Sequence, residues 1–95
     1  MAHDAEHDIH PDRHGLADAV ALSWVREETV TGRARRTRER ARLSQRELAR
    51  GVGVAVATLQ SWEQSRRAPR GAPALRYAAL LRALARVSAE MELTA

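Results

Sequence analysis

Hydrophobic residues recur at helical spacing in three stretches of the chain, and no stretch shows the alternation of a half-buried strand. Residues 16–30 place apolar side chains four positions apart along one face. In residues 56–65, Leu59 and Trp62 lie three positions apart, again on one helical face. Residues 74–88 repeat apolar side chains at steps of three and four and predict an amphipathic closing helix. The pattern therefore predicts an all-α fold.

A specific signal for the start of a helix lies at Ser44. Its hydroxyl can accept a hydrogen bond from the amide of Glu47, whose carboxylate can reach back to the Ser44 amide. Leu43 and Leu48 occupy the two positions of a hydrophobic staple. Gly53 can end this helix in the left-handed conformation that glycine adopts at little cost. A second helix follows at once, which is the outline of a helix-turn-helix motif, although a generic helical hairpin has the same outline.

These signals divide the chain into four segments. We expect a flexible tail over residues 1–15, an acidic helix over residues 16–32, a helix-turn-helix domain over residues 33–88 and a fraying tail over residues 89–95. The apolar face of the acidic helix either packs on the domain or faces a partner, and the pattern leaves both open. Within the domain, Pro73 suits the first turn of the closing helix.

Four histidines in the first segment suggest metal binding, because imidazole is a common metal ligand. His3, His7, His10 and His14 recur at steps of three and four residues. Pro11, however, interrupts a helix between the second and the fourth of them. We therefore interpret these residues as a tail and predict no metal site.

Charge is distributed very unevenly along the chain. Its net charge of +4 conceals −5 over residues 1–32 and +11 over residues 33–86, and all 16 basic residues are Arg. Such a basic stretch beside an acidic one indicates a polyanionic partner. The most cationic part, residues 33–42, fits a solvated helix, and an arginine-rich RNA-binding peptide has a similar composition.

The composition sets further limits. The 95 residues, 44% of them hydrophobic and 29% charged, suit one small globular domain. The chain has no Cys and no long apolar run, so we expect a cytoplasmic protein without disulfides or membrane segments. With two Trp, one Tyr and no Phe, the core is thin, and we expect a second subunit to support it.

Residues 37–69, TRERARLSQRELARGVGVAVATLQSWEQSRRAP, resemble the Cro/C1-type (XRE) family of helix-turn-helix DNA-binding domains. The matching features are Arg38, Leu43-Ser44-Gln45, Glu47-Leu48-Ala49, Gly53-Val54, Thr58-Leu59, Trp62-Glu63 and Arg66-Arg67. The segment TLQSWEQSRRAP with its Pro/Gly loop is similar to the antitoxin branch of that family. Two positions depart from the family: Ala55 stands where Ser usually caps the second motif helix, and Ser65 stands where Gly often closes it.

The resemblance implies a compact helix-turn-helix bundle of about five helices, with the second motif helix in the major groove. It implies base contacts from Val56, Ala57, Gln60 and Ser61. Among these, Gln60 suits adenine best, because a Gln amide can bond to its N6 and N7 together. An exposed helical glutamine without a partner is the alternative.

The resemblance also implies contacts to the DNA backbone and one structural ion pair. The expected phosphate contacts are Gln45, Arg46, Thr58, Arg66, Arg67 and Arg70. Arg38 and Glu63 correspond to the family's ion pair, which orients the second motif helix.

The function that follows is sequence-specific binding of double-stranded DNA by a transcriptional regulator, expected to be a homodimer and a repressor of its own promoter. One alternative is an antitoxin whose main role is to neutralise a toxin protein. A second alternative is an arginine-rich RNA-binding protein. We expect no enzymatic activity and no cofactor, because the basic domain holds only three acidic residues, no His and no Gly-rich phosphate loop.

Overall fold

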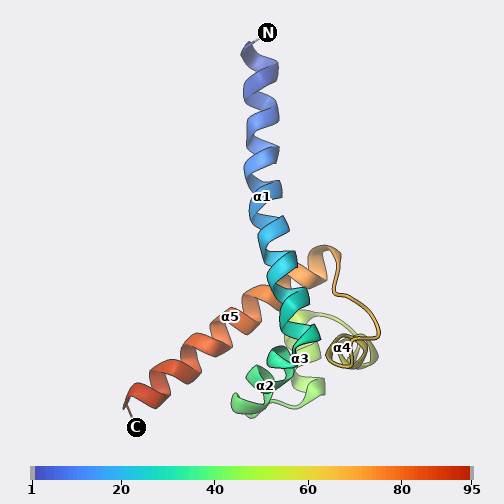
Figure 1. The fold of residues 1–95 in the computed structure, drawn as a ribbon, viewed down its shortest axis with the longest axis vertical. Coiled ribbons are helices and arrows are strands. Elements are labelled where there is room, and N and C mark those ends of the chain that lie inside the picture. Colours follow the sequence, from blue (N-terminus) through green and yellow to red (C-terminus); the bar gives the residue numbers. More distant parts are fainter. Residues whose placement is uncertain (1, 95) are drawn as a thin grey trace.

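The computed structural model describes the backbone of residues 2–94 and the side chains of residues 15–94. This part of the chain forms five helices and no strand, which confirms the predicted all-α fold (Figure 1). The helices are α1 (Ala2–Val30), α2 (Arg33–Arg40), α3 (Gln45–Val52), α4 (Val56–Glu63) and α5 (Gly71–Thr94). No helix in the described part is long and apolar enough to cross a membrane.

A small core joins all five helices. Its buried residues are Val25, Ala34, Leu48, Ala49, Val52, Leu59, Trp62, Ala74, Tyr77, Ala78 and Leu81. Two aromatic rings lie at its centre: Trp62 of α4 stacks on Tyr77 of α5 with ring centroids 4.9 Å apart and planes at 24°. Such a stacked pair adds about 0.5–1.5 kcal/mol beyond the area that it buries. The other members are small or aliphatic, so the position of α4 depends strongly on Trp62.

The turns that separate the short helices lie where the sequence predicts them. Ser44 accepts a hydrogen bond from the Glu47 amide at 3.0 Å, and Glu47 accepts one from the Ser44 amide at 2.9 Å. The bond from the Ser44 amide is the main reason that the pKa of the Glu47 carboxyl group lies below its usual value, and the nearby Ser44 hydroxyl lowers this pKa further. Gly53 ends α3 with φ +85°, and Gly32 separates α1 from α2 with φ +80°. The left-handed backbone at both positions favours glycine, which adopts it at little cost.

Helix α4 is shorter than predicted. It ends at Glu63, two residues before the predicted end, because Ser65 has φ +58° and cannot continue a right-handed helix. The left-handed turn therefore falls at the position where the resembling family often has Gly, and here a Ser adopts it.

Helix α5 is longer than predicted at both ends. The sequence predicts a helix over residues 74–88 followed by a fraying tail, but α5 continues to Thr94. Residues 89–93 are Ala, Glu, Met and Leu, which are strong helix formers. The hydroxyl of Thr94 also donates to the carbonyl of Met91 at 3.1 Å. Pro73 lies in the first turn, where its missing N–H costs no helical hydrogen bond.

Helix α1 begins at Ala2 and so includes residues that the sequence assigns to a flexible tail. Pro11 lies within the bounds of α1. A proline removes one backbone N–H donor from a helix, and a long helix can continue past it at a cost in free energy. The side chains of residues 1–14 lie outside the described part of the chain. The role of the four histidines therefore stays a prediction.

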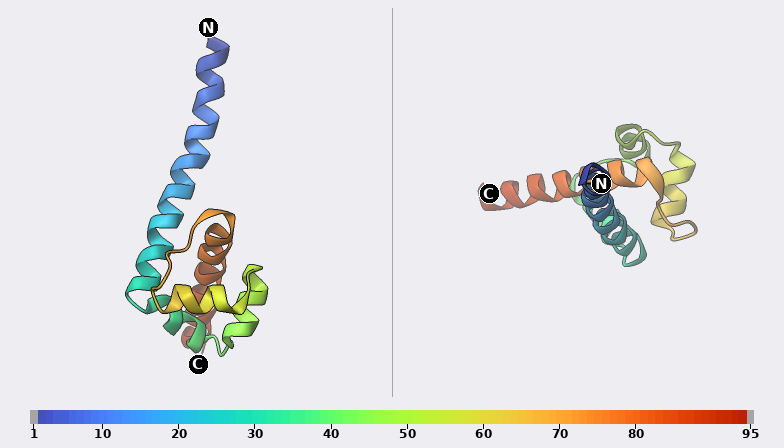
Figure 2. Two further views of the ribbon diagram at one scale, coloured as in Figure 1. Left: turned by 90° about the vertical axis from the view of Figure 1, so that its right-hand side faces the viewer. Right: turned by 90° about the horizontal axis from the view of Figure 1, so that it is seen from above.

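The C-terminal part of α1 packs on the other helices, whereas the turns that precede it in the sequence are exposed. Val25 is completely buried, but Leu16 and Val20 on the same helix are 68% and 56% exposed. The guanidinium carbon of Arg82 lies 4.7 Å from the ring centroid of Trp24, which joins α1 to α5 by a cation–π contact. Figure 2 shows the C-terminal part of α5 projecting away from α3 and α4.

Candidate nucleic-acid interface

A buried ion pair connects α2 to α4. The guanidinium of Arg38 donates to both carboxylate oxygens of Glu63, at 2.6 and 3.0 Å, and the Glu63 side chain is only 2% exposed. A third bond, from Arg38 to the carbonyl of Leu43 at 2.8 Å, holds the loop before α3. The hydrogen bond to Glu63 raises the pKa of Arg38 above its usual value. The structure thus brings together the two residues that the sequence analysis expected to orient α4.

Two glutamine side chains extend this pair toward the surface. The side-chain nitrogen of Gln45, at the start of α3, donates to Glu63 at 3.0 Å. The side-chain nitrogen of Gln60 in α4 donates in turn to the Gln45 oxygen at 3.1 Å. We refer to Arg38, Glu63, Gln45 and Gln60 as the polar relay. It joins α2, α3 and α4 through side chains alone.

The relay fixes the orientation of both amides. A carboxylate can only accept hydrogen bonds, so Gln45 must turn its nitrogen toward Glu63. Its oxygen then faces Gln60, which must present a nitrogen. Gln60 keeps its oxygen and its second N–H for another partner. On α4, Gln60 therefore presents one free acceptor, its side-chain oxygen, beside one free donor, its second side-chain N–H.

The four residues expected to contact bases all lie on α4, but they differ in exposure. Ala57 is exposed, whereas Val56, Gln60 and Ser61 are half-buried. Val56 packs against the core in addition. Fewer of these side chains are therefore free at the surface than the sequence suggests. The free ones are Ala57 and the outer atoms of Gln60 and Ser61.

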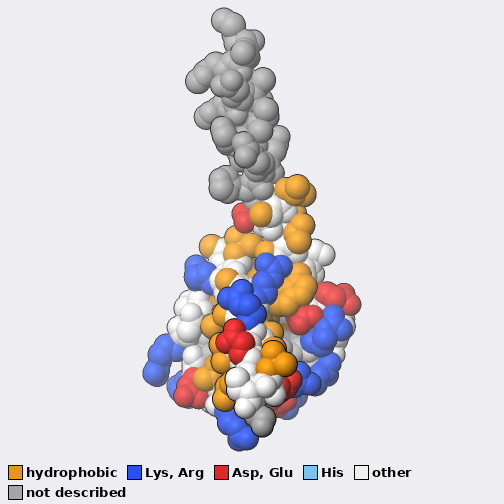
Figure 3. All heavy atoms as spheres, turned by 90° about the vertical axis from the view of Figure 1, so that its left-hand side faces the viewer, with side chains coloured by type: hydrophobic (Ala, Val, Ile, Leu, Met, Phe, Trp, Pro, Cys, Tyr) orange, Lys and Arg blue, Asp and Glu red, His pale blue; other side chains and the backbone are white. Residues whose placement is uncertain are grey.

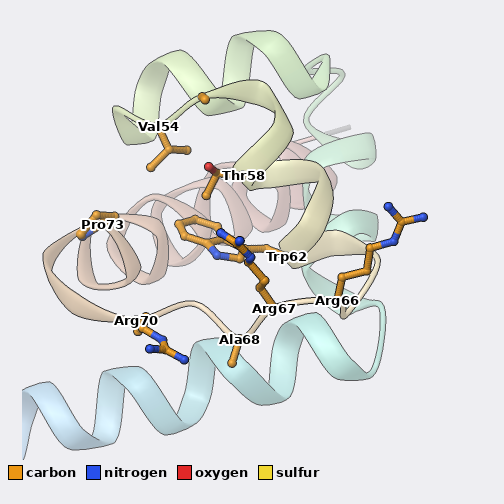
Figure 4. Close-up of a pocket in the computed structure, with 9 residues that line it drawn as sticks. Val54, Thr58, Trp62, Arg66, Arg67, Ala68, Arg70 and Pro73 are labelled. Atoms are coloured by element: carbon orange, nitrogen blue, oxygen red, sulfur yellow. The ribbon is translucent and has the colours of Figure 1, made fainter.

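Four of the six residues expected to contact phosphates line one cavity. Thr58, Arg66, Arg67 and Arg70 border a cavity of about 810 Å³ between α4, the following loop and the start of α5. Figure 4 shows Thr58 and Trp62 of α4 on the side of this loop, with Arg67 overlapping Trp62 in the view and Arg66 and Arg70 extending away from the two. Arg46 is exposed on α3 and does not line the cavity, and Gln45 belongs to the polar relay. The cavity thus gathers three positive charges beside the second motif helix.

Helix α1 holds the loop that carries these arginines. Arg26 donates to the carbonyl of Pro69 at 2.9 Å, and Pro69 itself is buried. The Ser65 hydroxyl donates to the carbonyl of Thr29 at 3.4 Å. The sequence analysis missed Arg26, because nothing local in the sequence marks a contact across 43 positions. The charged loop is anchored at both ends on a helix that lies outside the motif.

Two short helices joined at a left-handed glycine, with a basic loop after the second, define a helix-turn-helix domain. A helix-turn-helix family model matches residues 35–84, which is more than half of the chain. The chain therefore belongs to the Cro/C1-type (XRE) helix-turn-helix family, whose members are DNA-binding regulators. Comparison with curated proteins and with solved structures gave no match. Helix α1 lies before the matched region.

Proposed function

We propose that this protein is a transcriptional repressor that binds a specific double-stranded DNA sequence with α4 in the major groove. The observation that carries the proposal is the polar relay, which fixes the Gln60 amide, beside a loop with three arginines. A preset amide can discriminate between bases, and the arginines supply affinity that does not depend on sequence.

In this proposal Gln60 recognises an adenine. Its free oxygen accepts from the adenine N6 amino group and its free N–H donates to N7, which is the pattern that this base alone presents in the major groove. Ala57, Ser61 and the outer edge of Val56 contact the neighbouring base edges, with the methyl groups suited to thymine. The relay holds Gln60 in this orientation before DNA arrives, so less side-chain entropy is lost on binding.

The DNA backbone is held from both sides of α4. Arg66, Arg67 and Arg70 contact phosphates along the loop, with Thr58 at the wall of the same cavity. On the other side, the start of α3 contributes Arg46 and the second N–H of Gln45. These contacts fix the register of α4 on the duplex without reading its sequence.

The protein acts as a homodimer in this proposal, because two half-sites one helical turn apart bind two linked copies far more tightly than one. A repressor of this kind occupies its own promoter. A second candidate function, an antitoxin that binds a toxin protein, is favoured by one observation, the exposed Leu16 and Val20 on α1. Co-purification of a stoichiometric toxin would support it, and a loss of that complex in a Leu16→Asp variant would locate the surface.

The first prediction tests base recognition against backbone contact. A cognate site is selected from random duplexes, and each variant is titrated against cognate and scrambled DNA at three salt concentrations. Gln60→Ala should cost about 1–3 kcal/mol on the cognate site, almost nothing on scrambled DNA, and should leave the salt slope unchanged. Arg66→Ala should weaken binding to both duplexes and reduce the slope of log K against log salt by about one unit.

Gln64→Ala is the matched control, because Gln64 is exposed at the end of α4 and takes no part in the polar relay. It should bind both duplexes as the wild type does. Equal losses of Gln60→Ala on the two duplexes would contradict the assignment of α4 as the recognition helix. Tighter binding of a single-stranded RNA than of the selected duplex would favour the RNA-binding alternative.

A further inference from the structure

The loop between α4 and α5, residues 64–70, is held in two different ways as it passes between α4 and α1 (Figure 4). Its first part is bonded to α4, because the amides of Arg66 and Arg67 both donate to the carbonyl of Ser61, at 2.9 and 3.4 Å. The second part, residues 68–70, has no such support, since none of its backbone amides donates a hydrogen bond to a described residue. Its position therefore depends on contacts outside the motif.

The contact that holds the second part comes from Arg26 of α1. Its Nε donates to the carbonyl oxygen of Pro69 at 2.9 Å, and Pro69 is buried. That carbonyl belongs to the same planar peptide unit as the amide nitrogen and Cα atom of Arg70, so the bond restricts both. On its other side, Arg70 is followed by Gly71, with φ +70°, a residue type of unusual backbone freedom. Without the bond from Arg26, this peptide unit is free to rotate.

We propose that Arg26 is a positioning residue for DNA binding: it holds the Pro69 carbonyl and thereby directs Arg70 toward a DNA phosphate, without touching DNA itself. The inference rests on the proposed function, in which Arg70 contacts the DNA backbone. An arginine whose backbone is already ordered loses less freedom on binding. The residue that sets this contact lies in α1, before the region that the family model matches.

The charge of Arg70 is available to a phosphate group. The cavity that it lines has no acidic residue in its wall, and Arg70 takes part in none of the ion pairs of the described residues. Figure 3 views the side of the molecule opposite to the loop, where arginines lie among acidic side chains. A guanidinium that no carboxylate neutralises binds phosphate well when its backbone holds it in place.

A double-mutant cycle on a duplex of random sequence tests the inference, because phosphate contacts do not depend on sequence. Arg70→Ala should weaken binding by about tenfold and Arg26→Ala by about fivefold, each with the slope of log K against log salt reduced by about one unit. Arg26→Ala combined with Arg70→Ala should bind no more weakly than Arg70→Ala alone, since both changes remove the same contact. Arg26→Ala combined with Arg66→Ala is the matched control, and there the two losses should multiply, because Arg66 is held by α4.

Arg26→Gln separates the hydrogen bond from the charge. The side-chain nitrogen of glutamine lies the same number of bonds from Cα as Nε of arginine, so this variant should keep the bond to Pro69 and bind within about twofold of the wild type. Arg82→Ala is the control for a lost positive charge where α1 meets α5, because the Arg82 guanidinium contacts Trp24 and donates no hydrogen bond to the loop. It should leave the salt slope unchanged.

Two results of these titrations would overturn the proposal. Arg26→Gln as weak as Arg26→Ala, with the slope of the Arg26→Ala and Arg70→Ala combination reduced by about two units, would mean that Arg26 itself contacts phosphate. Equal coupling of Arg26 to Arg66 and to Arg70 would mean that Arg26→Ala disturbs the domain as a whole.

NMR relaxation of the free protein measures the position of Arg70 without DNA. In Arg26→Ala the order parameter of the Arg70 amide should fall below about 0.6, while that of the Arg66 amide stays near about 0.85. Unchanged order at Arg70 would overturn the proposal. A wild type that binds no specific site would contradict the proposed function alone, because the random duplex and the relaxation data still decide the role of Arg26.

Discussion

At the scale of single residues, Glu63 of α4 is a buried carboxylate whose charge is satisfied by three hydrogen bonds. It accepts two hydrogen bonds from Arg38 and one from Gln45 while its side chain is almost fully buried. A buried pair of this kind adds little net stability, because desolvation offsets most of its attraction. Removing one partner is costly, since the other charge stays buried without compensation.

We predict that Glu63→Ala lowers the free energy of unfolding by about 3–5 kcal/mol and weakens DNA binding at the same time. Binding falls because Gln45 loses its acceptor and Gln60 loses its fixed orientation. Thermal unfolding and gel-shift titration measure the two effects. Glu39→Ala is the control, because the Arg35–Glu39 pair lies at the surface with side chains 62% and 50% exposed and should matter by less than about 1 kcal/mol. Equal melting temperatures for the two variants would refute the role assigned to Glu63.

At the scale of helices, the two motif helices begin in the same backbone geometry but are capped differently. Ser44 precedes α3 with φ −73° and ψ 163° and accepts the amide hydrogen bond of a capping box. Ala55 precedes α4 with φ −67° and ψ 149°, and it has no side-chain oxygen to offer. Helix α4 therefore begins without a hydrogen bond from a capping side chain to its first amide groups.

We predict that Ala55→Ser raises the free energy of unfolding by about 1 kcal/mol, because the backbone is already in the conformation of an N-cap. Urea unfolding measures the change. Ala79→Ser, at an exposed position inside α5, serves as the control and should lower stability slightly, since Ser is a weaker helix former than Ala. A neutral or destabilising Ala55→Ser would show that the N-terminus of α4 is already satisfied by another group.

What the sequence predicts well at this scale is local. The start of α3 and its end at Gly53 follow from side chains within a few positions, and the structure has both. The end of α4 is predicted two residues too late, because the left-handed turn falls on Ser65, and a serine does not indicate such a turn as a glycine would. The Gln45–Glu63 and Arg26–Pro69 hydrogen bonds join residues far apart in the chain, and such contacts become visible only when the helices pack.

At the scale of the whole molecule, α1 supports the motif although it precedes the region that defines the family. Val25 fills part of the core, and the ring of Trp24 makes a cation–π contact with the guanidinium of Arg82. Arg26 holds the basic loop by its hydrogen bond to the carbonyl of Pro69. Burying a valine side chain alone contributes about 1.5–3 kcal/mol. In a domain this small, each kcal/mol shifts the melting temperature by about 4–8 °C.

We therefore predict that a chain lacking residues 1–32 melts at least about 10 °C below the full chain or does not fold, even though residues 35–84 are intact. A chain lacking only residues 1–14 is the control, and it should melt within about 3 °C of the full chain, because the packed part of α1 starts at Ala21. Differential scanning calorimetry of both chains measures the difference. If the chain lacking residues 1–32 is as stable as the full chain, α1 does not stabilise the domain, and the loop arginines owe their position to α4 and α5 alone. If it is destabilised, the arginines that contact phosphate depend on a helix that never touches DNA in this proposal.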